Sequence, residues 1–495
     1  MSMEEQKAGP APADEGPKPP KKSKTGLWAA IAVIVIVVAL IALYFAGVFT
    51  PASTTNLPQA VYLVGYTGDG EVIMPEWWTN RAQWPTQWLF SEGLEAQSLF
   101  TDLANKGISV QSILGTAPTS PISSSYNNSN YIFTTEFQGN YSHAPGLYSA
   151  QSYDAVFVAA LAMVRTAITD PANALNTNST SFKAALRYVA GQIVPAGAQT
   201  IRPGQWSTAV SDLQAGTPID YYGASGALDF DQYGNVGSDY MVWGLNATNQ
   251  IYQKQFIPEG TWLNASSLST MAVPLATACT ISGTPTFATI LPLTGTLASY
   301  GPDMQNGTTL AAQDINNHGG ICGKQLTLLH YDSATTPSTG AAAAQTAISA
   351  GAQVIVGAAA SSVSLSVLAK VVPAGIIEIS PASTSPAFDS LDTTDQFWRT
   401  APSDALQGAA AAWYAYDVAG WRTMSVFYVD NAYGVGLGQV FAQGFTARGG
   451  KIYRMVSFLD GQPSYSAELQ TLFTPGVSTS AMSVTQAVWR DTWRA

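Results

Sequence analysis

Short apolar runs alternate with longer segments of mixed apolar and polar residues along most of the chain. The alternation is most regular in the second half, where FATILPL, QLTLLHYD and AQVIVGA are each followed by a segment with helical spacing. Apolar runs of strand length that are separated by helices indicate βαβ units, and therefore parallel sheets with helices on their faces. The pattern predicts an α/β fold.

The first half shows the same pattern with more interruptions. QAVYLVGYT and QWLFSEG predict strands, and SYDAVFVAALAMVRTA is apolar nearly all round, which predicts a buried helix. The segment YYGASGALDFDQYGNVGSDYMVWGL predicts turns followed by an edge strand. A stretch rich in Ser, Thr and Ala over 261–284 predicts a linker to the regular part of the chain.

One apolar run is long enough for a different role. Residues 26–48 read GLWAAIAVIVIVVALIALYFAGV, and no charged residue occurs between Lys24 and Asp69. About 20 apolar residues match the hydrocarbon core of a bilayer, so this run predicts a single transmembrane helix at the cell membrane. Lysines before it would keep a disordered tail, 1–25, in the cytoplasm and place the rest outside. A cleaved signal peptide is the alternative.

Composition and charge narrow the classes of partner and chemistry. The formal net charge is −11, whereas binding to nucleic acid calls for a basic face, so no nucleic-acid partner is expected. The three histidines are scattered and there is no CxxC pair, so neither a metal site nor a cofactor is expected. G-x-S-x-G, HExxH and P-loop patterns do not occur. We therefore expect no catalytic residues and do not expect the protein to be an enzyme.

The two cysteines are Cys279 and Cys322. In an exported domain, two cysteines are most simply one disulfide. Closing a loop of roughly 40 residues would add about 3–4 kcal/mol of stability in a chain-entropy account. Two buried free thiols are the alternative.

Several segments together resemble one family. The run LPLTGTLASYGPDMQNGTTLAAQDINNHGG, with VIVGAAASSVSLSV, ISPASTSP, FWRTAPSDALQG and VFYVDNAYGVGLG, is similar to the first part of type I periplasmic (extracytoplasmic) solute-binding proteins. The nearest group is the leucine/isoleucine/valine-binding protein family of ABC importers. The segments VYLVGYTGDG, WLFSEG, YSAQSYDAVFVAALAM and YYGASGALDFDQYGNVGSDYMVW resemble the second part of that family. The resemblance implies a two-lobed type I periplasmic-binding-protein fold of parallel sheets flanked by helices, preceded here by the transmembrane helix.

The two parts stand in reverse order, so the chain resembles a circular permutant. We expect the second part over 56–260, the linker over 261–284, the first part over 285–475, and a poorly ordered tail over 476–495. One lobe would gather 148–260 and 283–416, and the other 56–147 and 417–475. A tandem duplication or a rearranged gene would give the same order.

The resemblance also implies a ligand site. In that family, Ser and Thr hydroxyls and loop amides of one lobe bind the carboxylate of an amino acid, and an acidic residue of the other lobe binds its ammonium group. Aromatic residues close over the bound amino acid. The matching positions are Ser361, Ala382, Thr384, Tyr300, Glu92, Tyr66 and Tyr433. Each has a plainer interpretation: Ser361 and Thr384 as helix caps, Glu92 as a solvated turn residue, and the tyrosines as packing residues.

The function implied is that of a membrane-anchored substrate-binding protein. It would capture an amino acid or a related amide, of the branched-chain class, for an ABC permease and ATPase on separate chains. A sensory ectodomain of the same fold and a rearranged fragment without function are the alternatives.

Overall fold

The computed structural model describes residues 57–119, 129–258, 278–391 and 395–474. The predicted membrane helix, the tail before it and the tail from 476 lie outside these residues, as does most of the predicted linker. The described residues, all from Leu57 onward, belong to one compact unit.

The strands of the described residues form three sheets. Two are built mainly of parallel strands, and the third is small. In spatial order, the seven-stranded sheet contains β15 (Lys451–Phe458), β14 (Thr423–Val429), β1 (Ala60–Val64), β2 (Gln87–Phe90), β3 (Leu114–Thr119), β7 (Asp239–Leu245) and β8 (Ile251–Ile257). The five-stranded sheet contains β10 (Thr327–Asp332), β9 (Thr286–Leu291), β11 (Val354–Gly357), β12 (Ile377–Ser380) and β13 (Phe397–Arg399), and the small sheet β4 (Gln199–Ile201), β5 (Ile219–Gly223) and β6 (Gly226–Ala227).

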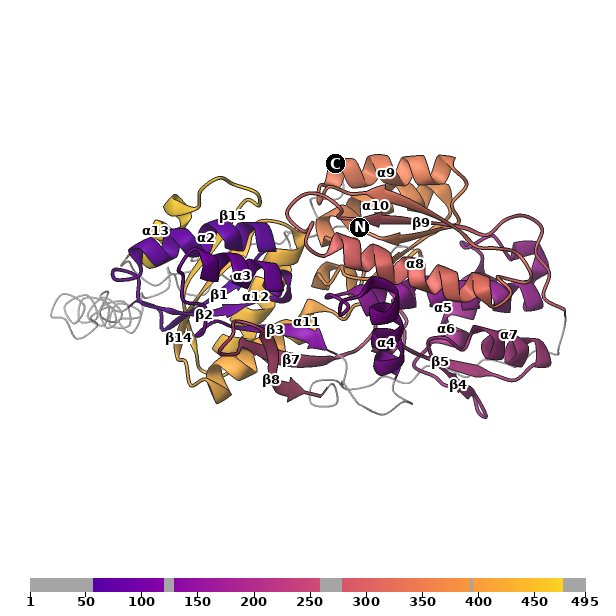
Figure 1. Ribbon diagram of the computed structural model, residues 1–495, viewed down its shortest axis with the longest axis horizontal. Helices are drawn as coiled ribbons and strands as arrows, with labels where there is room; N and C mark the ends of the chain where they lie inside the picture. Colours follow the sequence, from indigo (N-terminus) through magenta and orange to yellow (C-terminus); the bar gives the residue numbers. More distant parts are fainter. Residues whose placement is uncertain (1–56, 120–128, 259–277, 392–394, 475–495) are drawn as a thin grey trace, which may run out of the picture. The chain divides into compact units, whose positions relative to one another are not determined.

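Strands from the two halves of the chain share the seven-stranded sheet. In β1, Ala60 pairs in parallel with Met424 of β14 on one side and with Gln87 of β2 on the other. Figure 1 shows the indigo strands of the first half beside the yellow and orange strands of the last part of the chain. All five residues of β1 are buried, as expected for a central strand that is covered on both faces.

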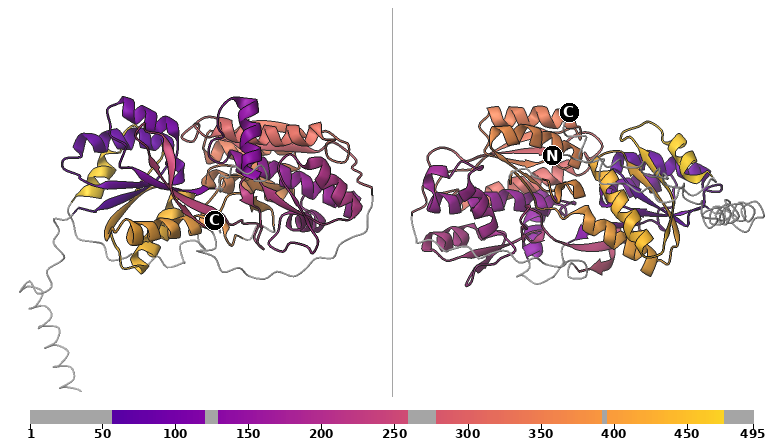
Figure 2. Two further views of the ribbon diagram at one scale, coloured as in Figure 1. Left: turned by 60° about the horizontal axis from the view of Figure 1, so that its bottom comes forward. Right: turned by 180° about the vertical axis from the view of Figure 1, so that it is seen from behind.

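Helices cover both faces of this sheet (Figure 2). One layer contains α2 (Thr67–Asn80), α3 (Gln97–Asn105) and α13 (Ser466–Phe473), and the opposite layer contains α11 (Asp404–Trp413) and α12 (Ala432–Ala447). The resulting α/β architecture confirms the predicted fold class.

The five-stranded sheet is packed against an almost fully buried helix. That helix is α5 (Ser149–Thr169), which contacts β11 and β12 and packs along α8 (Gly301–Asn317). Among the described residues, α5 has the length and apolarity to cross a membrane, but 94% of its most apolar window is buried within the protein. The predicted burial of this segment is therefore confirmed. The remaining helices are α4 (Ser129–Tyr141), α6 (Thr180–Val189), α7 (Trp206–Ala215), α9 (Pro337–Ser349) and α10 (Ser361–Ala374).

Two expectations about the lobes are wrong. The strand predicted at the end of YYGASGALDFDQYGNVGSDYMVWGL is β7, and it is not an edge strand, because β8 pairs with its outer side. Both strands, and α11, were expected with the lobe that holds 283–416. They belong to the seven-stranded sheet and its helical layer instead, since β7 pairs with β3 and α11 packs on β3 and α12.

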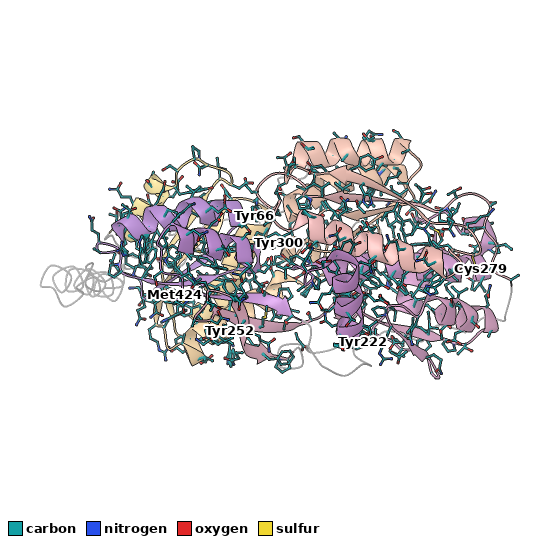
Figure 3. All side chains as sticks on the ribbon, viewed as in Figure 1. Tyr66, Tyr222, Tyr252, Cys279, Tyr300 and Met424 are labelled. Carbon is teal, nitrogen blue, oxygen red and sulfur yellow. A yellow bond between two sulfur atoms is a disulfide. The ribbon has the colours of Figure 1, made fainter. Side chains whose placement is uncertain are left out.

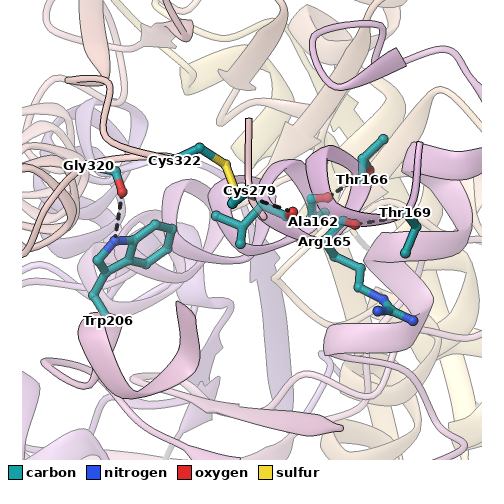
Figure 4. The surroundings of a disulfide bond; sticks show 9 residues. Ala162, Arg165, Thr166, Thr169, Trp206, Cys279, Gly320 and Cys322 are labelled. Atoms are coloured by element: carbon teal, nitrogen blue, oxygen red, sulfur yellow. Dashed lines mark hydrogen bonds between the residues drawn. A yellow bond between two sulfur atoms is a disulfide. The ribbon is translucent and has the colours of Figure 1, made fainter. Parts of the chain in front are cut away.

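Cys279 and Cys322 form a disulfide with a Cα–Cα distance of 5.2 Å and a sequence separation of 43 (Figure 4). The bond joins the segment before β9 to the turn between α8 and β10. Both cysteines pack against the hydrophobic cluster around α5, and the Trp206 indole donates to the Gly320 carbonyl beside the bridge at 3.1 Å.

Candidate functional site

All seven predicted binding residues follow the carboxyl ends of parallel strands. Tyr66, Glu92 and Tyr433 come directly after β1, β2 and β14 of the seven-stranded sheet. Tyr300, Ser361, Ala382 and Thr384 come after β9, β11 and β12 of the five-stranded sheet. This edge of a parallel sheet is where loops and helix N-termini converge on ligands.

The seven residues meet around one cavity. It contains about 400 Å³ of space between atoms, part of it open to solvent. Its other lining residues are mostly apolar: Gly93, Leu147, Tyr148, Pro292, Leu297, Met304, Ala359 and Ala360. None of these lining residues is a lysine or an arginine, so the charges nearest the cavity are carboxyl groups.

Serine and threonine side chains form one wall. Ser361 is the first residue of α10, whose N-cap is Ala360, and its hydroxyl accepts a hydrogen bond from the Ser385 amide at 3.2 Å. The Thr384 hydroxyl donates to Oδ2 of Asp404 at 2.8 Å. Neither Ser361 nor Thr384 is a helix N-cap residue, which removes their plainer interpretation.

The opposite wall carries Glu92, which is 3% exposed and therefore not a solvated turn residue. Its Oε2 accepts a hydrogen bond from Nε2 of Gln407 at 2.6 Å. Burial raises the pKa of Glu92 to about 7, against the opposing effect of the donors around it. Burial, followed by the negative charge of Glu92, raises the pKa of Asp404 well above its usual range.

Three of the predicted tyrosines enclose the cavity. The rings of Tyr66 and Tyr433 stack with centroids 5.7 Å apart, and the Tyr66 hydroxyl accepts from the Asn431 side chain at 2.9 Å. Tyr300 lies beside Tyr66 (Figure 3), and its hydroxyl donates to the main-chain carbonyl of Glu92 at 3.3 Å. The tyrosines therefore connect loops of both large sheets.

Sequence reasoning missed Tyr148, Asp404 and Gln407. Tyr148 lines the cavity from the residue before α5, with a positive φ of 64°, and its hydroxyl has no hydrogen-bond partner among the described residues. No local pattern marks it. Asp404 and Gln407 lie in FWRTAPSDALQG, a segment that carries the resemblance, but their contacts are with residues far away in the sequence.

The site therefore combines two mainly parallel sheets with one cavity at the carboxyl ends of their strands, a common position for small-molecule sites in α/β proteins. Residues 284–488 match the family described as "Periplasmic binding protein". Over these residues the chain is similar to the periplasmic binding proteins.

Three relatives illustrate the match. A Leu/Ile/Val-binding protein, BraC3 of Rhizobium johnstonii, is 30% identical over 181 residues, which cover 37% of this chain and 49% of the relative. The Leu/Ile/Val-binding protein homolog 3 of Brucella melitensis is 28% identical over 191 residues, covering 39% and 52%. The crystal structure of a leucine-binding protein, LivK of Thermotoga maritima, matches at 30% identity and a TM-score of 0.35, covering 38% and 52%. The chain thus spans about half the length of the curated relatives it matches.

Proposed function

We propose that this protein is an extracytoplasmic substrate-binding protein that captures an amino acid of the branched-chain class for an ABC importer. The permease and ATPase would be separate chains, and residues 26–48 would anchor the protein in the membrane. The observation that carries the proposal is the pairing of a buried acid, Glu92, with the wall of Ser361, Ala382 and Thr384 across one apolar cavity.

The charges in the cavity favour a zwitterion over a simple carboxylate. Glu92 would compensate an ammonium group, whereas an acid without an ammonium would bring a second negative charge beside it. The Ser361 hydroxyl and the first amides of α10 would receive the carboxylate, because a helix N-terminus presents free N–H groups. Leu297, Met304 and Leu147 would surround the side chain.

The lining residues also imply a change of shape on binding. Each of the seven predicted residues is at most 9% exposed. A ligand can enter only if the loops of the two large sheets separate, so we propose that they open and close around it.

The permuted order is part of the proposal. The family match covers the later part of the chain, while β1, β2, β3, β7 and β8 of the earlier part complete the sheet that β14 and β15 begin. A circular permutant keeps these pairings and moves only the chain ends.

Calorimetric titration of the full chain with leucine, isoleucine, valine and 4-methylpentanoate tests the proposal. We expect one of the amino acids to bind and 4-methylpentanoate, which lacks the ammonium, to bind at least tenfold more weakly. Glu92→Gln should remove that preference, whereas the matched variant Glu136→Gln, on α4 and outside the cavity lining, should keep it. A cooperatively melting protein that binds none of the three amino acids would rule the proposal out.

A further inference from the structure

The first turn of α11 contacts both walls of the cavity without lining it. Asp404 accepts the Thr384 hydroxyl at Oδ2, and its amide donates to the Thr384 carbonyl at 2.8 Å. Three residues further on, Gln407 donates to Oε2 of Glu92 at 2.6 Å and to the Thr116 carbonyl at 3.1 Å. Residues three apart share one face of a helix, so a single turn holds Thr384 on one side and Glu92 on the other.

This turn lies where the chain passes from one large sheet to the other. β13 of the five-stranded sheet ends at Arg399, and α11, which packs against the seven-stranded sheet, begins at Asp404. The turn is fixed by its cap, since the Ser403 hydroxyl accepts from the Ala405 amide at 3.1 Å and the Ser403 carbonyl accepts from the Tyr240 hydroxyl at 3.0 Å. Asp404 and Gln407 are fully buried.

The contact with Asp404 sets the direction of the Thr384 hydroxyl. A hydroxyl has one proton to donate and two lone pairs that accept. Because the hydrogen of the Thr384 hydroxyl points to Oδ2 of Asp404, only the lone pairs of this hydroxyl remain for a ligand. The hydroxyl therefore suits an ammonium, and not the carboxylate that the resemblance assigns to it.

The contact with Gln407 sets the direction of Glu92 in the same way. Oε2 of Glu92 and the Thr116 carbonyl oxygen both accept from Nε2 of Gln407, and this fixes the orientation of the Gln407 side-chain amide. This bond holds Oε2 of Glu92, and donors from Tyr433 and from the amides of Glu92 and Gly93 also act on its carboxyl group. We propose that Asp404 and Gln407 are positioning residues that together aim Thr384 and Glu92 at the ammonium group of the ligand. This proposal rests on the proposed amino-acid-binding function, and it identifies Asp404 and Gln407 as the residues through which the site selects for an ammonium group.

The main test compares two ligands that differ only in the ammonium. The full chain and its Asp404→Asn variant are titrated with L-leucine and with 4-methylpentanoate. The variant should bind leucine at least tenfold more weakly and bind 4-methylpentanoate equally well or better, since an amide at 404 can donate to Thr384 and carries no charge. Asp154→Asn, an equally buried aspartate on α5 outside the cavity lining, is the matched control and should leave both affinities unchanged. Equal weakening of both ligands in Asp404→Asn would overturn the proposal.

A second readout needs no ligand. The titration midpoint of Glu92 is followed by carbon NMR in the full chain labelled at the glutamate carboxyls. Gln407→Leu should raise the midpoint by removing a donor, whereas Asp404→Asn should change it little, because burial and the charge of Glu92 favour the protonated form of Asp404. Other charged groups nearby, Arg399 and Asp389 beside Asp404 and Glu95 beside Glu92, are present in both variants.

A midpoint raised in Gln407→Leu and unchanged in Asp404→Asn supports the positioning role even if no amino acid binds, in which case only the proposed function fails. A midpoint that neither variant moves would overturn the role of α11 whatever the protein binds.

Discussion

At the scale of single residues, burial rather than local sequence decides the chemistry of the acids. Glu92 follows β2 in WLFSEG, where the sequence allows a solvated turn, yet the folded chain excludes water from it and gives it one amide donor from α11. Asp404 is buried with one oxygen, Oδ1, unpartnered among the described residues. The two carboxyls close to the cavity therefore favour a protonated form in the absence of a compensating cation.

The affinity for an amino acid should depend on pH through Glu92. An ammonium binds the ionised carboxylate, and the pKa of Glu92 is about 7 before binding. Affinity should be nearly constant above pH 8 and should fall roughly tenfold per unit below pH 6, because a proton must leave first. Calorimetric Kd values at pH 8, 7, 6 and 5 measure this, with Glu92→Gln as the control that flattens the profile. An affinity that rises toward pH 5 would contradict the prediction.

Gly93 is required by close contact beside Glu92. A Cβ at this position would lie 2.4 Å from the Gly65 carbonyl oxygen, which is main chain and cannot rotate away. Gly93→Ala should lower the free energy of unfolding by roughly 1–3 kcal/mol and weaken ligand binding, since β1 and the Glu92 turn must separate.

Gly139 of α4 offers a matched control, since a Cβ there meets nothing within 4 Å. Gly139→Ala should stabilise the helix by about 0.5–1 kcal/mol. Chemical denaturation of both variants gives the comparison. Equal stabilities for the two variants would show that the contact at Gly93 relaxes freely.

At the scale of elements, the sequence predicts those with a strong pattern. The apolar runs of β1, β9 and β11 and the largely apolar α5 were predicted from periodicity alone, because both faces of these elements are buried. β3 and β8 were missed. β3 reads LGTAPT, with a glycine and a proline, and β8 reads IYQKQFI, an edge strand whose centre is the polar run Gln253, Lys254 and Gln255.

The disulfide should stabilise the part of the fold around α5 without touching the site. Its loop separation of 43 residues corresponds to roughly 4 kcal/mol in a chain-entropy account. The double variant Cys279→Ser with Cys322→Ser should unfold at a lower denaturant concentration, while its Kd for the ligand stays within about twofold of the wild type, because neither cysteine lines the cavity. A large loss of affinity at full folding would show that the bridge shapes the site.

At the scale of the whole molecule, buried carboxyl groups make the folded chain more stable under acidic conditions. Burial raises the pKa of Asp69 and of Asp154 to about 6, even though each accepts several hydrogen bonds. The pKa values of the half-buried Glu136 and of the more buried Asp229 rise for the same reason, and those of Glu95 and Glu378 rise further. These groups are protonated in the folded chain at pH values where they are ionised in the unfolded chain.

Stability should therefore increase as pH falls from 8 to 5. A carboxyl whose pKa is higher in the folded chain than in the unfolded chain, where it is about 4, stabilises the fold fully at pH values below the unfolded pKa. This stabilisation is lost as pH rises through the folded pKa, which is about 6 for Asp69 and about 7 for Glu92. The melting temperature of the ligand-free protein should be several degrees higher at pH 5 than at pH 8. Asp154→Asn should reduce the difference, and a lower melting temperature at pH 5 would contradict the account.

Sequence by itself determined the fold class and the loops that carry the site. The alternating apolar runs predict parallel strands, and the family resemblance assigned Glu92, Ser361, Ala382, Thr384 and the three tyrosines to the loops that follow them. The structure brings them to one cavity, and their binding role stays a prediction.

Tertiary structure alone decided the order of the strands and the partners of the site residues. β1 lies between β2 and β14 although 359 positions separate Val64 from Thr423. The pairing of strands that lie so far apart in the chain is not marked by any periodic pattern in the sequence. Thr384 and Glu92 acquire their hydrogen-bond directions from Asp404 and Gln407 for the same reason, because the identity of a residue fixes which atoms can donate or accept, and only its neighbours in space fix where they point.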